Sequence, residues 1–162
     1  MIMTPIEELW TKLKFASPLP KLTEEQARLI IPMLEEEYQT RRARQIHYLL
    51  ARSGMKQKKR FEDFDWTFNP KIPREKIMEF RSSPWVEEAR NLVCIGPTGV
   101  GKSHVAHSLC YEAIQNGIPT ACITCYDFVG KLKRSRNKYG LLQYYSMVKV
   151  LCIDELGYVF PS

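Results

Sequence analysis

The feature that most constrains this chain is a stretch of eight residues, G-P-T-G-V-G-K-S, at positions 96–103. It matches G-x-x-x-x-G-K-[ST], the pattern of a glycine-rich turn between a β-strand and an α-helix. A short apolar run at 91–95 precedes it, as expected for a buried parallel strand. Residues 104–115 follow with helical spacing of apolar side chains, and Asn-Gly at 116–117 gives a stop signal. Strand, loop and helix agree, so the stretch predicts a phosphate-binding loop and not an ordinary turn.

The residue types in this loop suit a nucleoside triphosphate. Backbone N–H groups at a helix N-terminus can surround negative charge, and glycine lets the backbone approach it closely. Lys102 is predicted to contact the β- and γ-phosphates, and the Ser103 hydroxyl is predicted to ligate Mg²⁺. The residues predicted to bind the nucleotide, ATP, are Gly96, Pro97, Thr98, Gly99, Val100, Gly101, Lys102 and Ser103.

An acidic pair, Asp154 and Glu155, follows the apolar run at 147–153. In phosphate-binding-loop proteins an aspartate after such a strand holds the Mg²⁺ shell, and Asp154 fits that position. Glu155 could polarise the attacking water as a general base. An Asp-Glu pair alone is often only a turn, but its place after a phosphate-binding loop favours a magnesium site with hydrolytic chemistry.

Alternating strands and helices after residue 90 predict an α/β fold with a parallel sheet, and ligands at the carboxyl ends of its strands. Strands are predicted at 91–95, 119–124 and 147–153. Helices are predicted at 73–80 and, starting at 83–85, in a short segment before the strand at 91–95. Another helix is predicted with Asp127 as its cap, with a break at 139–140 before a further helical turn. The N-terminal part predicts two capped helices, at 5–13 and from 23 to 52, the second kinked at Pro32.

Three domains follow from these patterns: a basic helical domain at 1–60, a linker at 61–72 and a partial core at 73–162. The linker begins F-E-D-F-D-W-T-F, which is aromatic and acidic. Two interpretations of it remain open. Its aromatic side chains could pack on the surface of the core, or they could also form a wall against the nucleotide base.

The charge distribution suggests an anionic partner. The net charge is +6, and residues 41–60 contain eight Lys and Arg residues without one Asp or Glu. A second cluster, at 131–138, contains five. A solvated helix face is the alternative, but such faces usually mix both signs, so contact with the phosphate backbone of DNA is the favoured reading. No apolar run is long enough to cross a membrane and no signal peptide is recognisable, which favours the cytoplasm.

The five cysteines are interpreted as reduced thiols. Cys94, Cys122 and Cys152 lie in apolar, strand-like runs, where cysteine behaves as a small hydrophobic residue. Cys122 and Cys125 form a CxxC pair, but no second CxxC or CxxH follows at the spacing of a zinc site. A metal or redox role is therefore the less favoured alternative.

Three stretches resemble the IstB/DnaC-like AAA+ ATPases. These are G-P-T-G-V-G-K-S-H at 96–104, I-D-E-L-G-Y at 153–158 and F-E-D-F-D-W at 61–66. The resemblance runs from about residue 23 to the end and is closer to the IstB branch, the ATP-binding helpers of insertion-sequence transposases. It implies an AAA+-like P-loop NTPase core behind an N-terminal helical domain. For the site it implies phosphate binding by the loop including His104, Mg²⁺ ligation by Ser103 and Asp154, and catalysis by Glu155.

The same resemblance implies partners. Members of this family assemble on double-stranded DNA as homo-oligomers when complete, and recruit a transposase. The other branch loads a replicative helicase, and this is the alternative function; a small-molecule kinase is a weaker third possibility, because no arginine-bearing lid is recognisable. A site built from His104, His107 and Cys110 explains His104 less well than the family motif does.

The sequence departs from the family pattern at its end. AAA+ proteins continue with two more strands, an arginine finger and often a helical lid, and this chain stops at residue 162. The strand after Asp154 would lie between the strands that end at Ile95 and Ile153. We therefore expect a gap in the sheet centre or, if the two strands close it, a displacement of Asp154 from Lys102 by about 4.8 Å. The 1–162 chain alone is expected to bind ATP weakly and to hydrolyse none.

Overall fold

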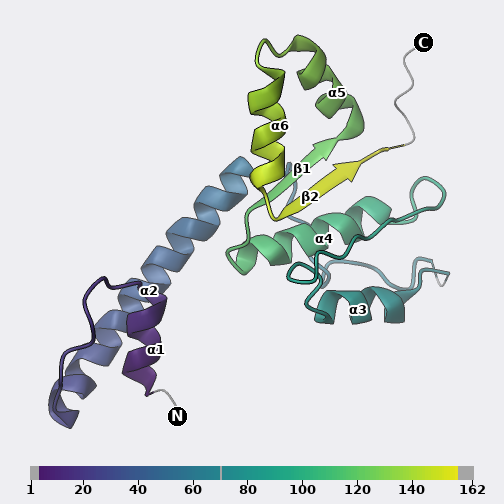
Figure 1. The fold of residues 1–162 in the computed structure, drawn as a ribbon. Helices are drawn as coiled ribbons and strands as arrows, with labels where there is room; N and C mark the ends of the chain where they lie inside the picture. The colour runs from purple at the N-terminus through teal and green to yellow at the C-terminus, as the bar shows by residue number, and fades with distance from the viewer. Residues whose placement is uncertain (1–3, 70, 157–162) are drawn as a thin grey trace. The chain divides into compact units, whose positions relative to one another are not determined.

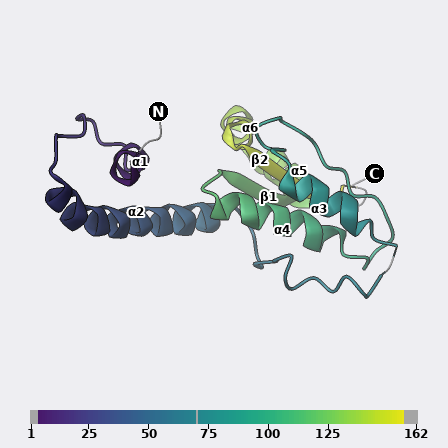
Figure 2. The same ribbon diagram turned by 90° about the horizontal axis from the view of Figure 1, so that it is seen from below.

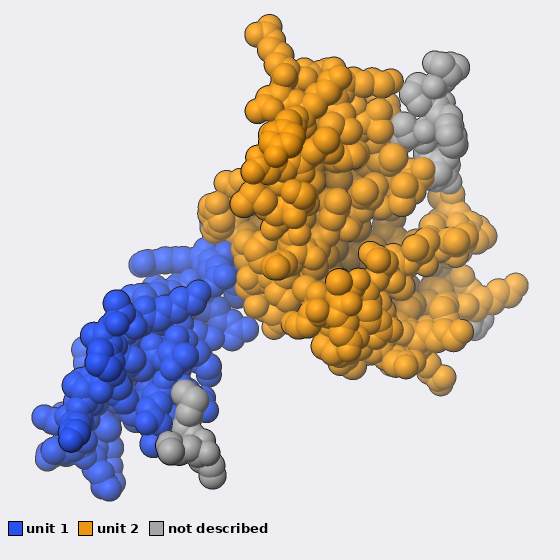
Figure 3. Space-filling model, in the orientation of Figure 1, with its two compact units in different colours: residues 1–47 blue, residues 48–162 orange. Residues whose placement is uncertain are grey.

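The structure, a computed structural model, describes residues 4–69 and 71–156. The chain forms two compact units, residues 1–47 and 48–162, which Figure 3 shows in blue and orange. One long helix, α2 (Glu24–Arg52), begins in the first unit and ends in the second. No helix among the described residues is both long enough and apolar enough to cross a membrane.

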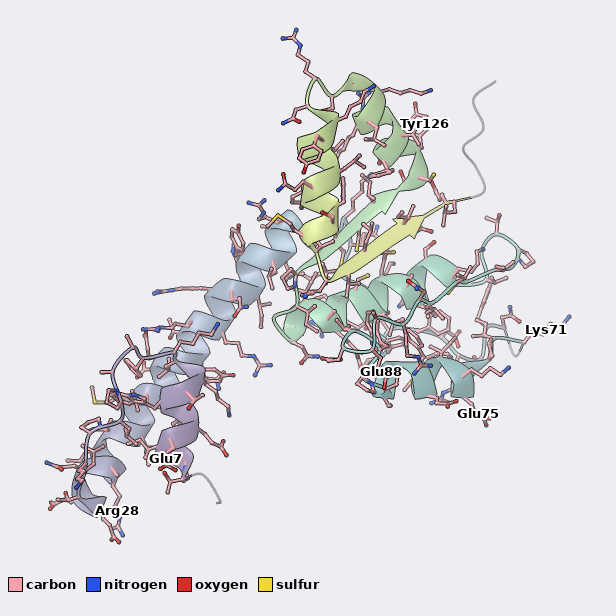
Figure 4. The ribbon with its side chains drawn as sticks, viewed as in Figure 1. Glu7, Arg28, Lys71, Glu75, Glu88 and Tyr126 are labelled. Carbon is pink, nitrogen blue, oxygen red and sulfur yellow. The ribbon has the colours of Figure 1, made fainter. Side chains whose placement is uncertain are left out.

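The first unit consists of α1 (Pro5–Lys12) beside the first part of α2 (Figures 1 and 2). The predicted capping box begins α1: the backbone N–H of Thr4 donates to Glu7 Oε2 at 2.7 Å (Glu7 is labelled in Figure 4). The Arg41 guanidinium ties the two helices together by donating to the Leu13 carbonyl at 3.1 Å. Pro32 lies inside α2, which continues to Arg52, and Gly54 follows with a φ of +74° as a helix-ending residue.

The second unit is built around two parallel strands, β1 (Thr120–Thr124) and β2 (Val150–Asp154), paired so that Cys122 lies opposite Cys152. The other elements are α3 (Arg74–Ser82), α4 (Lys102–Gln115), α5 (Cys125–Arg134) and α6 (Lys138–Met147). Helix α4 covers one face of the sheet, and α5 and α6 cover the other (Figures 1 and 2). The predicted α/β class with a parallel sheet is confirmed at this level.

Alternation of side chains along the two strands separates two buried clusters. The cluster on the α4 side contains Cys110, Ala113, Cys122 and Val150, with Cys152 packed against it. The cluster on the opposite side contains Ala121, Ile123 and Tyr145, with Ile153 packed against it. Because helices cover both faces of the sheet, the sequences of the two strands are nearly continuous apolar runs. Both strands could therefore be predicted from the sequence.

The aromatic segment after residue 60 is part of the core of this unit. Phe61 is only 4% exposed and lies in a cluster with Phe80, Val105 and Leu109. Upstream of it, the carbonyl of Ser53 accepts a hydrogen bond from the Cys122 N–H at 2.6 Å. The compact unit that carries the glycine-rich loop, residues 48–162, thus includes this aromatic segment and the end of α2. The first interpretation of the aromatic segment, packing on the core, is confirmed.

Several local predictions differ from the structure. Residues 91–95 form no strand, and residues 85–89 form turns after the point where a short helix was predicted to start. Thr124, not Asp127, caps α5, because the Thr124 hydroxyl accepts from the Asp127 N–H at 3.1 Å. The predicted break at 139–140 lies inside the first turn of α6, where Asn137 is the N-cap and accepts from the Gly140 N–H at 2.8 Å. The Asn137 cap, three residues upstream, offsets the helix-breaking tendency of Gly140.

Candidate functional site

The glycine-rich loop leads directly into the N-terminus of α4. Gly101 is the N-cap of this helix and has a φ of +93°, and Gly99 has a φ of +83°. A side chain at either position would be strained, because φ values in this range favour glycine. The backbone at Gly99 and Gly101 therefore takes left-handed conformations immediately before the N–H groups of the first helical turn.

Lys102 and Ser103 begin α4 and extend from the loop in different ways. The Lys102 ammonium donates to the carbonyl of Pro97 at 2.6 Å, so its side chain folds back over its own loop. The Ser103 hydroxyl donates to Asp154 Oδ1 at 3.0 Å, across 51 positions of the sequence. The structure thus brings together two of the residues predicted to form the site, one at the start of α4 and the other at the end of β2.

The chain turns sharply after β2. Glu155 has a φ of +58°, which is uncommon for a residue with a side chain, and its N–H donates to Asp154 Oδ1 at 2.9 Å. Asp154 Oδ1 therefore accepts from both the Ser103 hydroxyl and the Glu155 backbone. Such strained positions occur often at functional sites, where the surrounding structure holds them. Glu155 is exposed, so its carboxylate lies at the surface next to Asp154.

His104 connects the loop helix to the aromatic segment. Its Nε2 lies 2.8 Å from the Arg60 carbonyl, within hydrogen-bond distance, and its ring meets the Phe64 ring edge-on at a centroid distance of 5.0 Å. Phe64 also lies against the loop, because a Cβ at Gly101 would come within 2.6 Å of its ring. The sequence predicted Phe64 only as a linker residue; its contact with Gly101 depends on the tertiary packing.

Behind Asp154 lies a group of polar side chains that sequence reasoning did not join to the site. His107 Nε2 is 3.9 Å from Asp154 Oδ2, and the ligand atoms of His107, Cys122 and Cys152 lie within 4.8 Å of one another. The neighbouring Cys152 side chain raises the pKa of His107 above its ordinary value, although burial acts against it. The neighbouring thiols of Cys110 and Cys122 hold the pKa of Cys152 below its ordinary value.

The apolar run at 91–95, before the loop, is exposed and is not a buried strand. Val93 is 74% exposed and Ile95 is 91% exposed, and on β2 the side chain of Leu151 is also exposed. Among the described residues, β1 alone pairs with β2. Because residues 91–95 form no strand, the gap expected between two strands stays a prediction, and so does the displacement of Asp154 from Lys102 that closure of this gap would cause. Asp154 Oδ1 lies 3.0 Å from the Ser103 hydroxyl.

The fold and this loop define the class of protein: an α/β domain with a P-loop at the start of a helix and an aspartate at the end of a parallel strand. The family model of the IstB-like ATP binding protein matches residues 22–161. The chain belongs to this family.

Curated relatives come from insertion sequences. An ATP-binding protein of insertion sequence IS232 from Bacillus thuringiensis subsp. berliner is 32% identical over 133 residues, which is 80% of this chain and 53% of the relative. That of IS5376 from Geobacillus stearothermophilus is 34% identical over 130 residues, with 78% and 52% covered. That of IS21 from Pseudomonas aeruginosa is 31% identical over 129 residues, with 78% and 49% covered. The chain spans about half the length of these relatives.

Proposed function

We propose that this chain carries the ATP- and Mg²⁺-binding part of a DNA transposition helper, which acts on double-stranded DNA together with a transposase. The observation that carries the proposal is the contact between Ser103 and Asp154 at the mouth of the glycine-rich loop. The names of the relatives support the insertion-sequence role over helicase loading. In this proposal the loop from Gly96 to Lys102, with His104 behind it, holds the phosphates.

The pair formed by Ser103 and Asp154 fits Mg²⁺. Mg²⁺ takes oxygen ligands at about 2.0–2.1 Å in an octahedron, so neighbouring ligand oxygens lie about 2.9 Å apart. The Ser103 Oγ to Asp154 Oδ1 distance of 3.0 Å matches this spacing. When bound, Mg²⁺ neutralises charge on the β- and γ-phosphates. Ser103 and Asp154 would hold the ion, and the exposed carboxylate of Glu155 would orient and deprotonate the attacking water.

The assignment of Ser103 and Asp154 predicts a specific loss. Asp154→Asn and Ser103→Ala should remove most of the gain in ATP affinity that Mg²⁺ provides, because each variant loses one oxygen ligand of the ion. ATP affinity measured in excess EDTA should change little. Isothermal titration calorimetry with and without Mg²⁺ measures both quantities.

Asp127→Asn is the matched control, because it makes the same chemical change in the first turn of α5, away from the loop. It should keep the wild-type response to Mg²⁺. If Asp154→Asn and Asp127→Asn respond to Mg²⁺ equally, the magnesium ligands are elsewhere.

The basic stretch at 41–60 supports the DNA part of the proposal, although its members differ. Arg41 is already paired with Glu37 at 2.6 Å, and the Arg52 guanidinium lies over the rings of Tyr48 and Tyr144. Lys56 and Lys58 lie in an exposed segment after α2. Exposed lysines are the groups that bind phosphates without reading base sequence.

For DNA binding we expect a strong dependence on salt and a weak dependence on sequence. The logarithm of the affinity should fall linearly with the logarithm of the salt concentration, by about 0.9 for each phosphate contact. The double variant Lys56→Ala/Lys58→Ala should reduce this slope by about 1.8. Fluorescence anisotropy with labelled duplexes of original and scrambled sequence measures the slope and the sequence preference.

The control double variant is Lys71→Ala/Lys76→Ala, which removes the same charge from two other exposed positions (Lys71 is labelled in Figure 4). Its slope should equal that of the wild type. A salt-independent interaction, a strong sequence preference or an equal effect of both double variants would contradict phosphate binding by the 41–60 stretch.

A further inference from the structure

Three side chains from three elements meet between α4 and the sheet. They are His107 on α4, Cys122 on β1 and Cys152 on β2, and one ligand atom from each lies within 4.8 Å of the other two. No motif described from the sequence contains all three of these residues. The CxxC pair uses Cys125, which begins α5, and the His104-based alternative uses a ring that instead bonds to the Arg60 carbonyl.

The register of the sheet explains why these residues converge. Cys122 and Cys152 are Cα partners in the parallel ladder, so their side chains lie on the same face, and that face is the one covered by α4. His107 and Cys110 are three positions apart in α4, which places both on one side of the helix. Cys110 is buried and packs in the same cluster as Cys122 and Cys152.

We propose that His107, Cys122 and Cys152, whose ligand atoms converge, form a binding site for a thiophilic divalent cation, zinc, and that the thiol of Cys110, which packs in the same cluster, turns toward the ion as the fourth ligand. Cys₃His is a ligand set of closed, tetrahedral structural zinc sites. At a Zn–S distance of about 2.3 Å, sulfurs in a tetrahedron lie about 3.8 Å apart. The ligand atoms of His107, Cys122 and Cys152 lie within 4.8 Å of one another, so small side-chain movements would bring them to the spacing of a tetrahedral site.

The chemistry of this donor set separates it from the magnesium site. Thiolate and imidazole ligands select zinc over Mg²⁺ and Ca²⁺, which prefer oxygen. The surroundings are mainly apolar, since Ala113, Val150 and Trp85 pack in the same cluster, and an apolar shell excludes competing water. The His107 side chain is 24% exposed, which leaves one side from which an ion can enter. Binding would release the thiol protons to solvent.

A bound cation would fix the elements that carry the nucleotide site. Cys152 lies two positions before Asp154 on β2, and His107 lies one helical turn after Ser103 on α4. Zinc would therefore tie β2 to α4 just behind the Ser103–Asp154 contact. Metal binding itself does not depend on the proposed ATP function, so the two proposals can fail separately.

The test uses the 1–162 chain, reduced and stripped with EDTA, then titrated with zinc against a chromophoric chelator and separately with cobalt(II). We expect one equivalent of tightly bound zinc. We also expect cobalt(II) to give sulfur-to-metal charge transfer and the intense visible bands of a tetrahedral thiolate site. Cys122→Ser and Cys152→Ser should each weaken zinc binding by more than about 100-fold, beyond the loss typical of an outer-shell partner.

Cys125→Ser is the matched control and should keep the wild-type affinity, because Cys125 lies outside the cluster. Circular dichroism checks that each variant folds. If Cys122→Ser does not fold, His107→Gln at the partly exposed position provides the same comparison. Zinc binding no tighter in the wild type than in these variants, an octahedral cobalt spectrum, or a Cys122–Cys152 disulfide that persists under reduction would each overturn the site.

Discussion

Replacing Lys102 with alanine is expected to weaken ATP binding by about 100-fold or more. The lysine is proposed to contact the β- and γ-phosphates, and charge-assisted hydrogen bonds of this kind contribute about 1.5–3 kcal/mol each. In the structure the ammonium already lies over the loop, bonded to the Pro97 carbonyl. Its loss should therefore change phosphate affinity with little effect on the fold. Titration calorimetry with ATP and Mg²⁺ measures the change, and thermal unfolding checks the fold.

Glu155→Gln provides the comparison, because Glu155 is exposed and is proposed to act on water and not on the phosphates of bound ATP. This variant should bind ATP as tightly as the wild type, and it should lose any ATP turnover that the wild type shows. If Lys102→Ala and Glu155→Gln lose affinity equally, the division of roles between the two residues is wrong.

Gly101→Ala should destabilise the second unit by about 1–3 kcal/mol and displace the loop. Two costs combine at this position. The φ of +93° is unfavourable for a side chain, and the added Cβ would lie 2.6 Å and 2.7 Å from two carbons of the Phe64 ring. Because Phe64 packs against His104 and the Phe61 cluster, the ring has little room to move. Thermal unfolding and ATP titration measure the two effects.

Gly99→Ala separates these costs. Gly99 has a φ of +83°, but nothing lies within 4 Å of a Cβ added there, so only the backbone cost of about 1–2 kcal/mol applies. Adding Phe64→Leu to Gly101→Ala should recover part of the lost stability by opening space beside the loop. Equal destabilisation by Gly99→Ala and Gly101→Ala, with no recovery in the double variant, would show that the Phe64 contact is unimportant.

Features that depend on a few neighbouring residues could be predicted from the amino-acid sequence alone. The glycines at 99 and 101, the start of α4, the capping box at Thr4 and the end of α2 near Gly54 all follow from local backbone preferences and local hydrogen bonds. The runs that became β1 and β2 were visible because burial on both faces requires apolar residues throughout. These features identified the fold class and the family.

Contacts between residues far apart in the sequence depend on the three-dimensional fold. The Ser103–Asp154 contact and the convergence of Cys122 with Cys152 depend on the register of two parallel strands and on the helix that covers them. The apolar run at 91–95 is the opposite case, because its local pattern predicted an element that the structure does not form. Its composition predicts a strand, but a strand needs a hydrogen-bonded neighbour, and no described segment pairs with it. Local pattern sets the tendency of a segment, and its partners in space decide whether that tendency is realised.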